Sequence, residues 1–256
     1  MLFKNIKRNE SKMGVFTNLL RQVNAKCGLD LYRMRLPQKV KNANTMFVGV
    51  DVVNMGRQCI VGMAASYNQH QMQYYSDVAI QELYRDMIGK GFTKRDQEEK
   101  VCQERKDKIV EFMSKAFKNY VKNNQGKRPE QIIVYRDGVG GPSYQEFVLK
   151  LEGPGGAMQE AIRKFDQNYN PKMLYVLVNK KHLTRLFEKV NGETCNPGPG
   201  TVVDVAIVES NGQNLFDFFM IANDNPRTAT AQPVHYSVVA NTTGMTKTEV
   251  EEVTYQ

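Results

Sequence analysis

Two aspartates end or interrupt strand-like stretches of this sequence, and together they could bind a divalent cation. Asp137 ends the run of β-forming residues 132–136 and is followed by glycines, whereas Asp51 interrupts the apolar stretch 46–53. A carboxylate at the tip of a buried strand faces a crevice. If the two strands are parallel neighbours, both carboxylates lie at the sheet edge where open α/β sheets bind ligands. Because two carboxylates so close repel each other unless a cation lies between them, the pair predicts magnesium bound to phosphate.

The composition is that of an ordinary soluble globular protein. The chain has 256 residues, of which 41% are hydrophobic and 24% charged, so it can bury a sizeable core as one domain or two. No apolar run approaches the roughly 20 residues of a membrane span, and the N-terminus lacks the apolar core of a signal peptide. Four scattered cysteines suit reduced thiols better than disulfides or a zinc site. We therefore expect a cytoplasmic or nuclear protein.

The charge balance favours a nucleic-acid partner. The formal net charge is +8 and the isoelectric point is about 9.2, and a positive field attracts a polyphosphate regardless of its sequence. This signal has low specificity, because scattered lysines usually form a solvated surface.

The first half of the chain predicts a meander of strands, a crossover helix and a return strand. Apolar spacing predicts a helix over 10–24, and the polar stretch 37–45 would join it to the main domain. Three strands then form a meander, a polar insertion follows, and a helix leads into a return strand; these segments are 46–53, 59–67, 71–80, 82–103, 104–121 and 132–137. A right-handed crossover places the return strand beside the first strand and parallel to it. The expected fold class is therefore α/β, an RNase H-like mixed sheet with flanking helices.

The second half continues the alternation of helices and strands. Helices are predicted over 145–151 and 156–165, and an apolar strand over 173–178 is followed by a basic cluster. A loop over 191–200 precedes further strands over 201–209, 216–223 and 234–240, and a final helix begins near Thr246.

Five motifs resemble, in order and approximate spacing, the PIWI domain of Argonaute proteins. They are Val48-Gly49-Val50-Asp51-Val52, Val134-Tyr135-Arg136-Asp137-Gly138-Val139-Gly140, residues 196–204 (Asn-Pro-Gly-Pro-Gly-Thr-Val-Val-Asp), Asp217-Phe218-Phe219 and Pro233-Val234-His235-Tyr236. The resemblance covers nearly the whole chain, and residues 24–28 and 196–200 are more similar to the Piwi clade than to the Ago clade. It implies an RNase H-like nuclease that cuts RNA paired to a small guide RNA.

The resemblance also implies a metal site. Family catalysis uses two Mg²⁺ ions, for which Mn²⁺ can stand in, held by three acids and a fourth ligand. Asp51 and Asp137 match the two aspartates directly and are the expected catalytic metal ligands. Glu104 is the best match for the catalytic glutamate, with Glu82, Glu98 and Glu99 as alternatives. Taken alone, Glu104 would more often be the first-turn acid of a helix, where a negative charge favours the helix dipole.

The ends of the chain depart from the family pattern. The family's fourth ligand lies beyond the helix that begins near Thr246, in a segment that this sequence lacks. We therefore expect a fragment of a longer protein or a form with an incomplete metal site. Residues 1–40 would be the C-terminal remnant of a MID domain with its linker, and 41–256 a PIWI domain without its C-terminal end.

Guide-RNA contacts are implied at two places. Gln22 and Lys26 match positions that hold the 5′ phosphate of the guide, and Lys180, Lys181 and Arg185 match a basic stretch near the nucleic-acid backbone. Such cations fix position, and base pairing by the guide reads sequence. The alternative interpretations are a helix-end charge for Lys26 and a solvated turn for the Lys180 cluster. The expected partners are a 5′-phosphorylated small guide RNA, complementary target RNA and silencing proteins.

Other polar residues and other functions remain open. Asp204, Asp217 and His235 are expected to be structural, since single residues of these types near strands usually are. A catalytically inactive guide-binding module that recruits silencing effectors would retain the fold without using metal. Another RNase H-like nuclease would share the paired acids but would have no use for Gln22 and Lys26.

Overall fold

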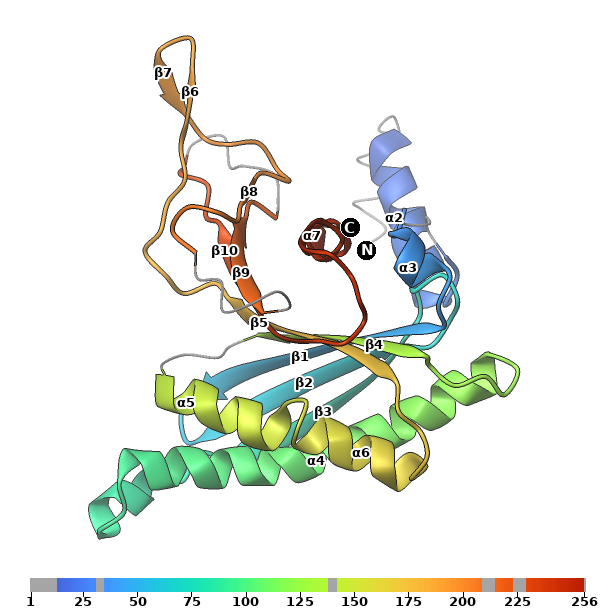
Figure 1. Ribbon diagram of the computed structural model, residues 1–256, viewed down its shortest axis with the longest axis vertical. Helices are drawn as coiled ribbons and strands as arrows, with labels where there is room; N and C mark the ends of the chain where they lie inside the picture. Colours follow the sequence, from blue (N-terminus) through green and yellow to red (C-terminus); the bar gives the residue numbers. More distant parts are fainter. Residues whose placement is uncertain (1–12, 31–34, 138–141, 209–214, 223–228, 256) are drawn as a thin grey trace, which may run out of the picture.

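A mixed β-sheet forms the framework of the chain (Figure 1). The computed structural model describes residues 13–30, 35–137, 142–208, 215–222 and 229–255. Within these ranges one sheet holds eight strands in the order β3-β2-β1-β4-β5-β10-β9-β8. Their bounds are β1 Thr45–Met55, β2 Gln58–Ser66, β3 Tyr74–Glu82, β4 Gln131–Asp137, β5 Lys172–Asn179, β8 Val202–Val203, β9 Phe216–Met220 and β10 Val234–Asn241. Residues 10–12, 31–34, 138–141, 209 and 223 of the predicted segments lie outside the described ranges.

The predicted strand connections are confirmed. Strands β1, β2 and β3 form an antiparallel meander. The crossover through helix α4 (Lys94–Asn123) brings β4 back beside β1 and parallel to it, and β5 then pairs in parallel with β4. The second half of the sheet is antiparallel, because β10 pairs with both β5 and β9. The chain therefore has the expected RNase H-like mixed sheet.

Helices cover the two faces of the sheet with two separate hydrophobic cores. On one face lie α4, α5 (Pro142–Phe147), the π-helical turn η2 (Val148–Glu152) and α6 (Ala157–Phe165), as Figure 1 shows. Phe112, Met113 and Phe117 of α4 are buried in that core. On the other face lies α7 (Lys247–Tyr255), whose Val250 and Val253 pack in the second core. None of the described helices is long and apolar enough to cross a membrane.

Helix α4 begins earlier than the sequence pattern predicts. The segment 82–103 was expected to be a polar insertion, but it contains a short 3₁₀ helix η1 (Arg85–Lys90) and the first turns of α4. Thr93 and Asp96 form a capping box: the Thr93 hydroxyl accepts a hydrogen bond from the Asp96 amide, and the Asp96 carboxylate accepts one from the Thr93 amide. The residues that follow are mostly good helix formers. The predicted start at Glu104 is therefore wrong.

Smaller predicted boundaries also differ. The strand expected over 201–209 is limited to β8, because the chain leaves the sheet at Asp204, which forms an ion pair with Lys247 of α7 at 3.2 Å. The loop expected over 191–200 contains β7 (Glu193–Cys195), which forms a separate hairpin with β6 (Glu188–Val190).

Within the described residues, two helices precede β1. Helix α2 (Met13–Lys26) has no buried residue within the described structure. Helix α3 (Gln38–Lys41) buries Val40 in the second core. The predicted boundary between the MID remnant (1–40) and the PIWI domain (41–256) therefore falls inside α3.

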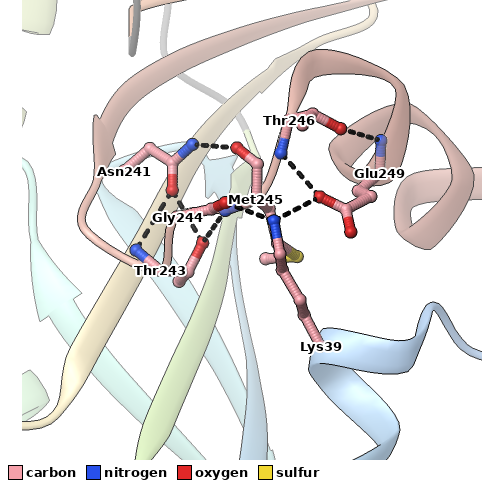
Figure 2. A network of polar contacts seen from close by, with 7 residues as sticks. All are labelled: Lys39, Asn241, Thr243, Gly244, Met245, Thr246 and Glu249. Carbon is pink, nitrogen blue, oxygen red and sulfur yellow. Dashed lines mark hydrogen bonds and ion pairs between the residues drawn. The ribbon is translucent and has the colours of Figure 1, made fainter.

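A polar network joins α3 to the start of α7 (Figure 2). Thr246 and Glu249 form a second capping box, in which the Thr246 amide donates to the Glu249 carboxylate at 2.8 Å. The ammonium of Lys39 donates to the same carboxylate, also at 2.8 Å, and to the carbonyl oxygen of Gly244. The Asn241 side chain holds the turn before α7 by donating to the Met245 carbonyl oxygen. This network fixes where α7 begins.

The capping box of α4 provides a test of the early helix start. Thr93→Ala removes the hydroxyl that accepts from Asp96 and is expected to lower the free energy of unfolding by about 1 kcal/mol. Thr93→Ser retains the hydroxyl and should stay close to wild type. Urea denaturation followed by circular dichroism measures both. Equal stability of all three chains would contradict the cap.

Candidate active site

The pairing of β1 with β4 brings Asp51 and Asp137 together. The two strands run in parallel, and their register extends from Thr45 opposite Gln131 to Val50 opposite Arg136. The next residue on each strand is one of the two aspartates. Both side chains line the same two adjoining hollows, of about 720 and 810 Å³. The structure therefore places the predicted pair at one edge of the parallel strands.

Both aspartates face the α7 side of the sheet. Side chains alternate between the faces of a strand, and Phe47 and Tyr135 belong to the core beneath α7. Asp51 and Asp137 lie an even number of positions from these residues and share their face. Val50, one residue away from Asp51, packs instead in the core beneath α4.

The two carboxylates have different surroundings. Asp51 is exposed, and its Oδ1 accepts a hydrogen bond from the Val52 amide at 2.7 Å. The Asp137 side chain is 20% exposed, and its Oδ2 lies 2.5 Å from the ammonium of Lys180. Lys180 directly follows β5, whose Val178 is opposite Asp137 in the sheet. The structure thus places Lys180, a predicted guide contact, at the aspartate pair.

The 720 Å³ hollow carries charges of both signs. Besides the two aspartates it is lined by Glu98 of α4. Cationic side chains also line it, namely Arg85, Lys94, Arg105, Lys180 and Lys181. Basic side chains suit the phosphates of a nucleic acid, and carboxylates suit a hard divalent cation.

The two aspartates provide carboxylate ligands of the kind that Mg²⁺ prefers. No three His, Cys, Asp or Glu side chains in the described ranges gather closely enough to hold a metal ion among themselves. Mg²⁺ is usually bound by one or two carboxylates together with water and substrate phosphates. Asp51 and Asp137 supply that number of carboxylates in a hollow that also has phosphate-binding cations.

Glu104 does not join the pair in this structure. Its carboxylate accepts a short hydrogen bond from the Tyr84 hydroxyl, which raises the pKa of Tyr84 to about 12. Glu104 lines a different hollow, with Met87 and Phe92. Because α4 begins at Lys94, Glu98 and Glu104 are both helical, and six residues turn a helix by about 600°, which puts them on different faces. Glu98, an alternative in the sequence analysis, lines the hollow of the aspartates.

The remaining predicted guide contacts lie on α2 and in the segment between β5 and β6. Gln22 and Lys26 are exposed on α2, and Lys181 is exposed at the rim of the 720 Å³ hollow. Arg185 is half-buried, and its guanidinium donates to the carbonyl oxygens of His182 and Thr184. Their guide-binding roles remain predictions.

Sequence reasoning missed three cations of the hollow, one of which, Arg105, lies in the predicted helix. Arg85 and Lys94 belong to the segment that was expected to be an unstructured insertion, and they reach the hollow because η1 and the first turn of α4 are ordered there. The Thr93-x-x-Asp96 spacing was the signal that could have found them.

Asp217 of β9 and His235 of β10 form a polar pair, and their expected structural role stays a prediction. His235 Nε2 lies 2.5 Å from Asp217 Oδ2, and the His235 ring stacks on Phe219 with 4.4 Å between centroids. His182 packs against the edge of the same phenyl ring, and burial lowers its pKa. Asp217 and His235 thus pair across the neighbouring strands β9 and β10, and His182 packs beside them.

Helix α7 borders the site and carries a perturbed acid. Val253 and Thr254 line the 810 Å³ hollow, and the Thr254 hydroxyl lies 3.0 Å from the Tyr135 hydroxyl. The pKa of Glu251 is raised to about 7, first by burial and then by the negative charge of Asp204, while Lys247 opposes the shift.

The fold and the paired acids define an RNase H-like protein, and the comparisons with known proteins specify the family. The whole chain, residues 1–256, matches the family model described as Piwi domain. It is 29% identical over 256 residues to Piwi-like protein 1 of Danio rerio, which covers 99% of this chain and 26% of that protein. It is 31% identical over 252 residues to Piwi-like protein Ago3 of Bombyx mori, and this alignment covers 97% of this chain and 24% of that protein.

A solved structure shares the fold. The crystal structure of Kluyveromyces polysporus Argonaute with a guide RNA aligns with a TM-score of 0.69 and 22% identity over 99% of this chain and 30% of that chain. The chain therefore belongs to the Piwi domain family. It spans about a quarter of the length of the two curated relatives.

The raised pKa of Glu251 in α7 predicts that the stability of the fold depends on pH. The fold favours the protonated carboxyl, so its stabilising contribution is present below the ordinary pKa of 4.5 and is lost as the pH rises through about 7. Glu251→Gln mimics the protonated form. The melting temperature of the variant minus that of wild type should increase from about pH 5 to about pH 8. Differential scanning calorimetry measures this difference, and a constant value would contradict the raised pKa.

Proposed function

We propose that the chain is the nuclease domain of a small-RNA-guided silencing protein that cleaves RNA complementary to its guide. The observation that carries the proposal is the pair of Asp51 and Asp137, which come from adjacent parallel strands and line one hollow. Family membership supports guided silencing as the setting, because the chain matches the Piwi domain along its whole length.

The residues of the hollow have distinct proposed roles. Asp51 and Asp137 hold the divalent cation, Mg²⁺ or Mn²⁺, through their carboxylate oxygens. When bound, such ions activate a water molecule and stabilise the leaving oxygen of a phosphodiester. The exposed cationic side chains of the hollow, namely Arg85, Lys94, Lys180 and Lys181, hold the phosphates on either side of the scissile bond, whereas Arg105 is buried and pairs with Glu152. Lys180, whose ammonium lies 2.5 Å from Asp137 Oδ2, would exchange that contact for a phosphate.

Guide RNA is the second proposed ligand. The Kluyveromyces polysporus Argonaute that shares this fold was solved with a guide RNA. In this chain Gln22 and Lys26 are exposed on α2 and can offer an amide and an ammonium to the 5′ phosphate. Base pairing by the guide would then select the target, and the protein would contact the backbone.

The aspartate roles can be tested by isosteric substitution. Asp51→Asn and Asp137→Asn keep the size of each side chain and remove its charge. In the full-length protein loaded with a guide, each variant is expected to lose detectable cleavage of complementary RNA and to retain guide binding. Denaturing gels measure cleavage, and filter binding measures guide affinity. Cleavage at the wild-type rate by either variant would overturn the assignment.

The third acid can be identified by comparing two glutamates of α4. Glu98→Gln is expected to reduce cleavage more than Glu104→Gln does, because only Glu98 lines the hollow of the aspartates. Single-turnover rates over a series of Mg²⁺ concentrations compare the two variants. The reverse order would assign the role to Glu104 and would require the first turns of α4 to move before cleavage.

A further inference from the structure

The residue before Asp137 points to the opposite face of the sheet. Arg136 is fully buried on the side of α4, whereas Asp137 faces the hollow. The guanidinium of Arg136 donates a short hydrogen bond to the main-chain oxygen of Asp137. Arg136 therefore contacts the backbone of the metal-binding aspartate from behind.

A buried glutamate holds Arg136 in this position. Glu152 has no exposed surface, and its Oε2 lies 3.0 Å from Nε and 2.9 Å from Nη2 of Arg136. Glu152 ends the π-helical turn η2. The backbone is closely packed just beyond it, since a Cβ at Gly153 would lie 2.7 Å from the carbonyl oxygen of Leu149. Close packing thus restricts the backbone next to Glu152, and Arg136 holds its carboxylate.

A second arginine completes the network from α4. Arg105 is 1% exposed, and its Nη1 donates to Glu152 Oε1 at 2.7 Å. Its Nε donates to the Gln81 side chain of β3 at 2.9 Å. One carboxylate therefore lies between two guanidiniums, and the network joins α4, β3, β4 and η2 within the core.

Such a network is expected to orient its members more than to stabilise the fold. Removing three groups of this kind from water costs much of the free energy that their attraction supplies, so a buried ion network adds little net stability. A guanidinium that makes several charge-assisted hydrogen bonds at once has, however, a fixed direction. The Arg136 guanidinium is held by Glu152 and in turn holds the carbonyl of Asp137.

We propose that Arg136 is a positioning residue for the metal-binding carboxylate of Asp137. Its guanidinium, fixed by Glu152, sets the backbone at the tip of β4 and so aims the Asp137 side chain at the cation. The inference rests on the function proposed above, in which Asp137 binds Mg²⁺ or Mn²⁺. Arg136 touches neither the cation nor the RNA.

Arg105 provides a matched control. Arg105 and Arg136 are both buried, and both contact the carboxylate of Glu152. Arg136 also donates to the main-chain oxygen of Asp137, and Arg105 serves as the comparison for that contact. Arg136→Lys and Arg105→Lys each keep the positive charge and lose the planar guanidinium. A purely structural role for the network predicts the same consequences for both variants.

The experiment measures Mn²⁺ binding by the full chain directly. The electron paramagnetic resonance signal of free Mn²⁺ gives the dissociation constant for wild type, Arg136→Lys, Arg105→Lys and Asp137→Asn. We expect Arg136→Lys to weaken binding about tenfold and Arg105→Lys less than about twofold, in line with the usual effect of groups that orient metal ligands. Melting temperatures should fall by similar amounts in both lysine variants.

The outcomes separate this inference from the proposed function. Equal weakening by both variants, or wild-type affinity in Arg136→Lys, overturns the positioning role while the metal site stands. If the wild-type chain binds Mn²⁺ no more tightly than Asp137→Asn does, both the metal site and the positioning role are overturned. If Arg136→Lys does not fold, Arg136→Gln, which keeps one amide donor toward Glu152 or the Asp137 carbonyl, replaces it with the same expected order.

Discussion

The site depends on the register of one parallel strand pair. Asp51 and Asp137 are like charges, and their mutual repulsion opposes the strand pairing that places them beside one hollow. The apolar side chains that precede them, such as Val48 and Val134, are completely buried under α4. A slip of one residue would turn those side chains to the opposite face. Burial of the core therefore imposes the register, and the register imposes the carboxylate pair.

Features with a local signal could be predicted from the sequence. The alternating and apolar runs around Asp51 and Asp137 indicated strands, and the helix between them indicated a crossover, whose handedness leaves little choice of neighbour for β4. The final helix was also predictable, because Thr246 and Glu249 have the spacing of a capping box.

Features that depend on distant contacts could not be predicted. The side chain of Lys180 was expected near RNA, and its ion pair with Asp137 follows from the pairing of β4 with β5. Glu104 was matched to the family's glutamate by its distance along the chain from Asp137. Helix α4 begins earlier than predicted, at Lys94, and that distance does not show on which face of the helix Glu104 lies. The contact of Arg136 with Glu152 depends on η2, whose π-helical turn has no clear sequence signal.

The proposed site requires Asp51 and Asp137 to bind one divalent cation between them. Crystals of the chain soaked in Mn²⁺ provide the most direct test, through their anomalous difference density. We expect a peak in contact with carboxylate oxygens of both aspartates, on the α7 side of the sheet. A peak that contacts at most one of them, or carboxylates turned away from each other in the presence of Mn²⁺, would contradict it.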